Sequence, residues 1–140
     1  VLKMRKRAWR YSSCIWLANH DTYDELAGIH KPGTNSDVYL FAPGNGTDVP
    51  DTLLGRPIVF TEYAATIGDK GDLILADWSQ YLEGTLEDLQ GAQSVHVRFE
   101  SRERCFLFWT RNAGAPWWRS ALTPKKSAST LSPFVVLQAR

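Results

Sequence analysis

The histidines and cysteines are the first side chains in this sequence that could do chemistry, because both residue types bind metals and act as nucleophiles or bases. No two of them stand at i, i+3 or i+4 spacing or in one short loop, as a metal site would require. We interpret both cysteines as reduced, buried strand residues of a cytoplasmically made protein, with a disulfide as the alternative. The sequence therefore predicts no metal and no other cofactor. The residues concerned are His20, His30, His96, Cys14 and Cys105.

Acidic residues offer two further kinds of site. Asp69 and Asp72 faintly resemble a calcium-binding loop, but the twelve-residue ligand pattern with its closing glutamate is missing, so turn chemistry explains them better. Glu83, Glu87 and Asp88 could supply paired acids for glycoside hydrolysis, but their stretch is the most polar of the chain, where carboxylates normally face solvent. The serines lack a Gly-x-Ser-x-Gly motif, and no glycine-rich phosphate loop is followed by Lys-Ser/Thr. We expect no catalytic residues, no enzyme and no small-molecule substrate.

Composition and charge narrow the choice of partners. Hydrophobic residues make up 44% and charged residues 22% of the 140 residues, as in globular proteins, which argues against wholesale disorder. The longest apolar stretches, such as residues 105–109, are far shorter than the roughly 20 residues that cross a bilayer, so we expect no membrane contact. The net charge of +1 gives no bulk attraction to nucleic acid. The basic cluster between Lys3 and Arg10 could still contact DNA phosphates without sequence specificity, or form a solvated end.

The aromatic content is high, with six tryptophans, five tyrosines and six phenylalanines. Aromatic side chains are enriched at the centres of protein interfaces, but tryptophan is also mostly buried in any fold. Trp117, Trp118 and Arg119 are open to both interpretations, as core residues or as a cation–π contact between subunits.

Hydrophobic patterns predict the elements that would position these residues. A helix is expected over residues 21–29, with Asn19 as a cap and Gly28 as a left-handed stop. Residues 83–93 are expected to form a polar surface segment, residues 95–100 a strand with one solvent-exposed face, and residues 112–114 a hairpin turn. This order predicts an α+β fold of mixed, mostly antiparallel sheets with one or two short helices. The other strands are expected over residues 12–18, 38–41, 58–63, 73–76, 104–111, 115–119 and 133–137.

Several short motifs follow one another along the chain. They are Leu53-Leu54-Gly55-Arg56-Pro57, residues 71–81 (GDLILADWSQY), residues 96–100 (HVRFE), Arg111, Pro116-Trp117-Trp118 and residues 131–135 (LSPFV). In this order and spacing the series resembles the major capsid proteins of tailed phages with the Hong Kong 97-type fold. The resemblance covers residues from about Ile15 to the end of the sequence.

The resemblance implies a subunit with an axial domain at the centre of each pentamer or hexamer, and a peripheral domain with a spine helix and a sheet. Residues 1–14 would be a basic lead-in, residues 15–93 an axial-domain-like region, and residues 94–140 strands of the peripheral-domain sheet and a carboxy-terminal strand. The family's amino-terminal arm, extended loop and spine helix precede these regions. Residues 1–14 are too short to supply them, so we expect the chain to be a fragment.

The function implied by the resemblance is structural. The chain would be part of a phage or prophage icosahedral capsid, made in the bacterial cytoplasm and located in the virion. Its partners would be copies of itself in pentamers and hexamers, with non-specific contact to the packaged DNA. Two alternatives remain: the shell protein of a cellular compartment that encloses cargo, and a small enzyme on an unrelated α+β fold.

The candidate site residues are accordingly structural. Gly55, Pro57 and Gly71 would set turns, and Asp77, Trp78 and Tyr81 would anchor the axial domain. Replacing Trp78 or Phe134 by alanine should cost roughly 3–5 kcal/mol if both are buried. Residues expected to pack the sheet are Phe99, Phe106, Phe108, Trp117 and Phe134, and the matched motifs add Arg56, Arg111, Trp118 and Pro133.

Overall fold

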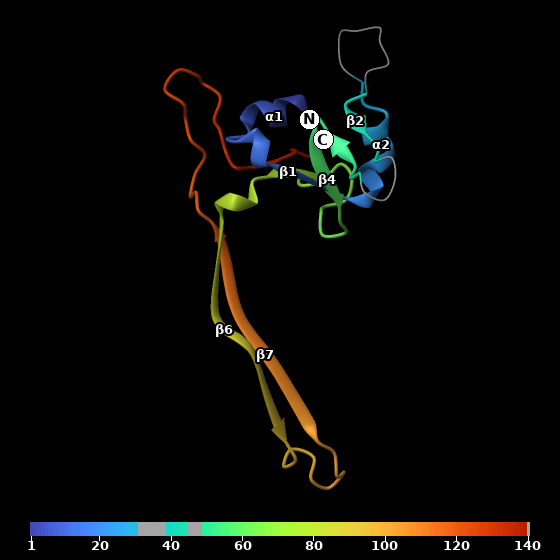
Figure 1. Cartoon of the computed structure of the whole chain (residues 1–140), viewed down its shortest axis with the longest axis vertical. Coiled ribbons are helices and arrows are strands. Elements are labelled where there is room, and N and C mark those ends of the chain that lie inside the picture. Colours follow the sequence, from blue (N-terminus) through green and yellow to red (C-terminus); the bar gives the residue numbers. More distant parts are fainter. Residues whose placement is uncertain (31–38, 45–48, 140) are drawn as a thin grey trace. The chain divides into compact units, whose positions relative to one another are not determined.

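The computed structural model describes residues 1–30, 39–44 and 49–139. They form two compact units, one made of residues 1–80 and 118–140 and the other of residues 81–117. The first unit contains a six-stranded sheet, and the second is a long two-stranded hairpin (Figure 1). The strands are mostly antiparallel and the helices are few and short, which confirms the predicted α+β class.

The sheet of the first unit has the strand order β2-β3-β4-β1-β5-β8. β1 runs parallel to β4 and antiparallel to β5, and the other neighbours in the sheet are antiparallel. A parallel neighbour requires a crossover connection, and the helix α2 (Tyr23–Ala27) lies within it. The strands are β1 (Ile15–Ala18), β2 (Phe41–Ala42), β3 (Thr52–Leu53), β4 (Arg56–Phe60), β5 (Leu73–Ala76) and β8 (Phe134–Val136).

The core of this unit lies on one face of the sheet. Trp16 stands opposite Ile58 on β4 and Leu75 on β5, so the three side chains share a face and are buried together. Met4 of helix α1 (Leu2–Arg7) and Leu26 of α2 belong to the same cluster. Burial of this face against two short helices explains why these brief elements hold together, since helices of one or two turns are not stable alone.

The predicted helix over residues 21–29 is found as a 3₁₀ turn, η2 (His20–Thr22), followed by α2. Asn19 caps it as predicted, because its side-chain oxygen accepts a hydrogen bond from the backbone N–H of Asp21 at 3.1 Å. The predicted left-handed stop at Gly28 is wrong. Gly28 has φ of −83°, and its N–H donates to the carbonyl of Asp24 at 3.3 Å, as in an ordinary last turn.

This difference predicts opposite outcomes at two glycines. Gly71 has φ of +100°, which an L side chain adopts only with strain, so Gly71→Ala is expected to destabilise the protein by about 1–2 kcal/mol. At Gly28 an added Cβ would meet only carbonyl oxygens at 3.7 and 3.8 Å, so Gly28→Ala is expected to be neutral or to stabilise by up to about 1 kcal/mol. Urea denaturation of both variants tests the pair. Equal losses would contradict the backbone assignment.

The second unit consists of β6 (Tyr81–Ser94) and β7 (Cys105–Pro116), paired from Tyr81–Pro116 to Ser94–Cys105. The predicted strand over residues 104–111 is therefore present and longer than expected. Three predictions are wrong: residues 83–93 form a strand, residues 95–100 lie in the turn that joins the strands, and residues 112–114 lie within β7. Pairing along a long ladder overrides the weak strand preference of Glu, Gln and Gly in β6.

The expected division of the chain near residues 93 and 94 falls at the end of β6, inside the hairpin unit. The carboxy-terminal strand β8 pairs with β5 in the six-stranded unit. Residues 1–14 include α1 and the 3₁₀ turn η1 (Tyr11–Ser13), which belong to the same unit. The remaining strand expected over residues 38–41 appears as β2, while residue 38 lies outside the described residues.

Candidate assembly surfaces

The hairpin strand β7 exposes apolar side chains on both of its faces. Successive side chains of a strand point to opposite faces, so Phe106 and Phe108 lie on one face and Leu107 and Trp109 on the other. Phe106, Leu107 and Phe108 are 61%, 62% and 67% exposed. Contiguous exposed apolar surface marks an interaction site, and a strand that is apolar on both faces is typical of a buried position in a sheet.

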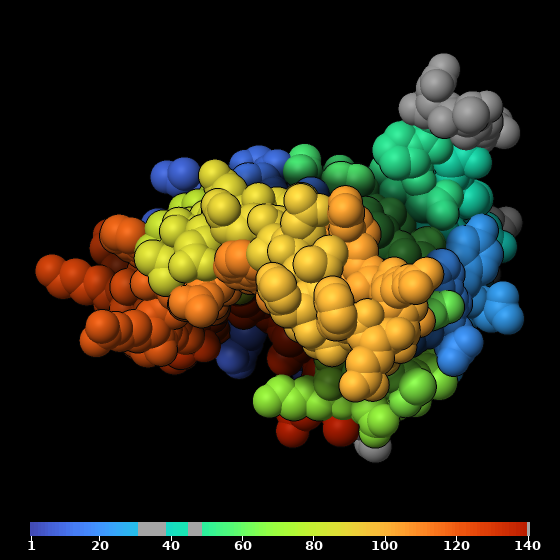
Figure 2. Space-filling model, turned by 90° about the horizontal axis from the view of Figure 1, so that it is seen from below, coloured from blue at the N-terminus to red at the C-terminus, as the bar shows by residue number. Residues whose placement is uncertain are grey.

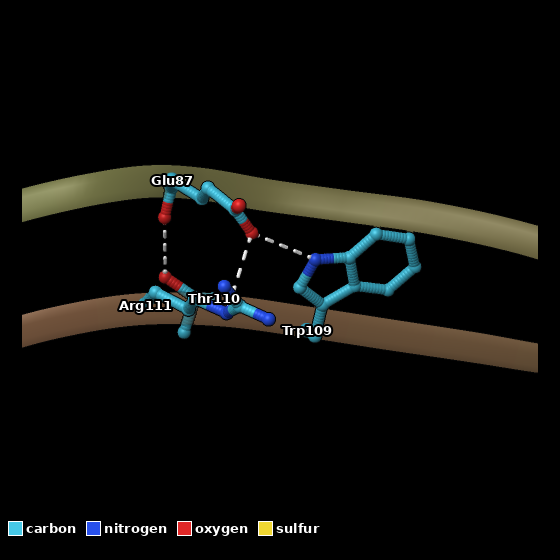
Figure 3. A network of polar contacts seen from close by, with 4 residues as sticks. All are labelled: Glu87, Trp109, Thr110 and Arg111. Carbon is cyan, nitrogen blue, oxygen red and sulfur yellow. Dashed lines mark hydrogen bonds and ion pairs between the residues drawn. The ribbon is translucent and has the colours of Figure 1, made fainter.

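A polar network around Glu87 joins the two strands at the irregular part of the ladder (Figure 3). The indole N–H of Trp109 donates to Glu87 Oε2 at 3.0 Å, and Arg111 Nε lies 3.7 Å from the same oxygen. The Thr110 hydroxyl donates to the backbone carbonyl of Glu87 at 3.1 Å. These contacts hold β7 in register beside β6, where the pairing shifts on both sides of Glu87.

The turn between the strands, drawn in yellow and orange in Figure 2, contains both apolar and charged residues. Val97 and Phe99 are 73% and 76% exposed. Arg98 and Glu103 form an ion pair at 2.9 Å across the turn, and both are largely exposed. Arg102 completes the turn with φ of +54°.

A buried carboxylate fastens three segments of the six-stranded unit. Asp77 follows β5 and is 1% exposed. Its Oδ2 accepts from the Ser13 hydroxyl at 2.7 Å, and its Oδ1 accepts from the Ser79 hydroxyl at 2.7 Å and from the Ser79 N–H at 3.2 Å. Its own N–H donates to the carbonyl of the buried Pro133 at 2.9 Å. Burial acts to raise the pKa of Asp77, but hydrogen bonds from Ser79 and Ser13 outweigh it, so this pKa lies below its ordinary value.

The basic amino-terminal helix packs onto the same unit through one side of α1. Met4 is buried, while the guanidinium carbon of Arg5 lies 4.7 Å from the centroid of the Tyr11 ring. The Tyr11 hydroxyl donates to the carbonyls of Leu53 and Leu54 at 3.3 and 3.0 Å. Burial raises the pKa of Tyr11 above its ordinary value.

The turn at residues 53–57 is a two-residue hairpin loop between β3 and β4. Leu54 and Gly55 have φ of +52° and +76°, the sign that a type I′ turn requires at both positions. Arg56 leaves this turn and donates from Nε to the carbonyl of Cys14 at 2.9 Å. Gly55 therefore sets a turn as predicted from the sequence, whereas Pro57 does not: it lies in β4 opposite Thr52.

A model of the phage capsid family matches residues 3–126. The chain belongs to the phage capsid family. No curated protein and no solved structure gives a significant match. Membership of a capsid family identifies the chain as a structural protein of a phage shell, and copies of the same protein are its partners.

Only part of the expected packing of this capsid protein is present in its described residues. Phe99 and Trp117 are 76% and 65% exposed, and Trp78 is 47% exposed, so none of the three is a core residue among the described parts of the chain. Trp78 contacts Phe134, with ring centroids 6.2 Å apart. The role of Asp77 as an anchor of the axial domain stays a prediction. Of its two serine partners, Ser79 is two positions away, but Ser13 is 64 positions away and no local pattern indicates it.

Trp117 and Trp118, at the carboxy-terminal end of the hairpin, could each be a core residue or a contact between subunits. The structure differs for the two. Trp118 packs against Trp9 with ring centroids 5.2 Å apart, and its indole N–H donates to Gln80 Oε1 at 3.0 Å. Trp118 therefore has a structural role in the capsid protein. Trp117 and Arg119 are exposed, which leaves them available to a neighbour.

The cysteines and the possible metal-binding side chains are the remaining reactive groups of this capsid protein. Cys14 is buried and Cys105 half-buried, and both are free thiols. Burial, followed by the nearby charge of Asp77, raises the pKa of Cys14. Within residues 1–30, 39–44 and 49–139, no three His, Cys, Asp or Glu side chains gather as metal ligands would. No helix in these ranges has the length and apolar character to span a membrane.

Proposed function

We propose that this chain is a non-enzymatic subunit part of a phage or prophage icosahedral capsid, whose copies form pentamers and hexamers around DNA. The observation that carries the proposal is the row of exposed apolar side chains on β7, because Phe106, Leu107 and Phe108 need neighbours that the chain itself does not provide in its described residues. Many modest contacts of this kind add up in a symmetric shell.

We assign the two units to the two domains of the capsid subunit. The six-stranded unit, with its closed core around Trp16, takes the axial role. The hairpin takes the role of two strands of the peripheral-domain sheet, where a covering layer would bury the faces of β7. Contact with DNA needs no specific site, because the exposed Lys3, Lys6 and Arg7 on α1 can interact with phosphates non-specifically.

Solution mass tests the assembly. We expect the protein expressed from its complete reading frame in a bacterial host to form rings or closed particles of megadalton mass, seen by light scattering over a range of concentrations and by electron microscopy. The isolated 140-residue chain serves as the comparison and is expected to stay small. Monomers of the complete protein under all conditions would contradict the proposed function.

A further inference from the structure

The two outer edges of the hairpin differ in their suitability for pairing with another strand. The β6 ladder shifts register twice, and β6 carries three acidic residues, Glu83, Glu87 and Asp88, and no basic one. Acidic side chains and bulges are the devices by which proteins protect an exposed edge. β7 has no acidic residue, and the extra residues at the shifts stand in β6, so the backbone of β7 is continuous.

We propose that β7 is a pairing edge and that its occupant is β7 of a second copy of this chain. The two strands run antiparallel about a twofold axis at Leu107, so that the sheet becomes β6-β7-β7-β6. This inference goes beyond the proposed capsomers, because it describes a contact between two copies that requires neither a ring nor a closed shell.

The register follows from the polarity of β7. The apolar run at residues 105–109 is centred on Leu107, and an axis at this residue places Leu107 opposite itself and Phe106 opposite Phe108. Cys105 then lies opposite Trp109. Each apolar side chain of the run thus meets an apolar partner, and aromatic cross-strand pairs of this kind stabilise a sheet.

Charge favours the same strand and the same register. The twofold axis at Leu107 keeps the two Arg111 side chains apart, because each lies four positions from the axis and on opposite sides of it. Antiparallel pairing of β6 with itself would instead bring the carboxylates of Glu83, Glu87 and Asp88 together. Like charges opposite one another destabilise a sheet, so β6 is the outer strand of the proposed dimer.

Cysteine cross-linking tests the register. In a Cys105→Ser background, Leu107→Cys places a thiol opposite itself across the proposed axis, and mild oxidation of the whole chain is expected to give a disulfide-linked dimer. Leu89→Cys in the same background is the matched control, since Leu89 is a 72% exposed leucine of β6, compared with 62% for Leu107. Efficient dimer formation by the first variant alone supports the proposal. Equal cross-linking of both variants, or of neither, overturns it.

A variant that places two equal charges at the axis tests the association without disulfide cross-linking. Leu107→Lys is expected to weaken the association constant of the dimer about tenfold or more in equilibrium sedimentation, because two lysines then face each other at the axis. Leu89→Lys, with the same change on β6, is expected to leave it unchanged, and circular dichroism verifies that both variants stay folded. A monomeric parent chain, or equal weakening by the two variants, overturns the proposal. Failure here leaves the megadalton assembly of the complete protein to be judged by its own experiment.

Discussion

Replacing Trp16 with alanine is expected to lower the free energy of unfolding by about 3–5 kcal/mol, the range for truncation of a large buried aromatic side chain. Trp16 has 0% exposure and lies on the central strand of the sheet, with Ile58 and Leu75 as its cross-strand neighbours. Alanine would leave a cavity that two neighbouring strands cannot close without losing their register. Chemical denaturation followed by far-ultraviolet circular dichroism measures the loss, which is a large part of the stability of a typical domain.

Trp78→Ala is the matched control in the same unit. Trp78 is 47% exposed and follows β5 in the 3₁₀ turn η3 (Trp78–Gln80), so its truncation is expected to cost less than about 2 kcal/mol. A similar loss for both variants would contradict the burial of Trp16 and would restore the larger cost that the sequence predicts for Trp78.

The sequence pattern predicts the burial of Trp16 but not the exposure of Trp78. The apolar run before Asn19 predicts a buried strand, and the strand is there as β1. The pattern after β5 does not determine whether Trp78 faces the core, because Asp77 ends the strand and the 3₁₀ turn then rotates the next side chain toward solvent. The residue before this turn, Asp77, also accepts a hydrogen bond from the distant Ser13, which no local pattern indicates.

Turns controlled by glycine were the most predictable part of the fold. Gly55 and Gly71 have positive φ, and both were identified from the sequence as turn residues because few other residues adopt that conformation. Gly28 shows the limit of this reasoning. A glycine at the end of a short helix can also keep right-handed geometry when its N–H finds a helical carbonyl, as it does with Asp24.

The hairpin could be predicted only in part. The apolar run of β7 is a strong strand signal, but β6 is polar and contains two glycines, Gly84 and Gly91, so its sequence alone favours a loop. β6 forms a strand because its backbone pairs along the whole length of β7. The pairings β1 with β4 and β5 with β8 were equally inaccessible, because each joins segments roughly 40 to 60 positions apart, such as Trp16 with Ile58 and Ile74 with Val136.

Replacing Asp77 with asparagine is expected to cost about 2–3 kcal/mol at pH 7, because hydrogen bonds to a charged acceptor contribute about 1.5–3 kcal/mol and the two serine hydroxyls lose that acceptor. Asp69→Asn is the control: its carboxylate accepts one exposed hydrogen bond from Thr66 at 3.1 Å, and its loss is expected to stay within about 0.5 kcal/mol. Urea denaturation at pH 7 compares the two. Equal effects would contradict the role of Asp77 in joining η1, β5 and the residue before β8.

The pH dependence of the same variant gives an independent test. Because the pKa of Asp77 is lower in the folded chain than its ordinary value of 3.8, its contribution to stability is complete above that value. It is lost as the pH falls from about 4 through the folded pKa, since the folded carboxylate must then take up a proton that the unfolded chain already holds. The difference in stability between the parent protein and Asp77→Asn is therefore expected to shrink in acid and to stay constant from about pH 5 to 7. A difference that grows in acid would mean that Ser13 and Ser79 do not hold Asp77 in its charged form.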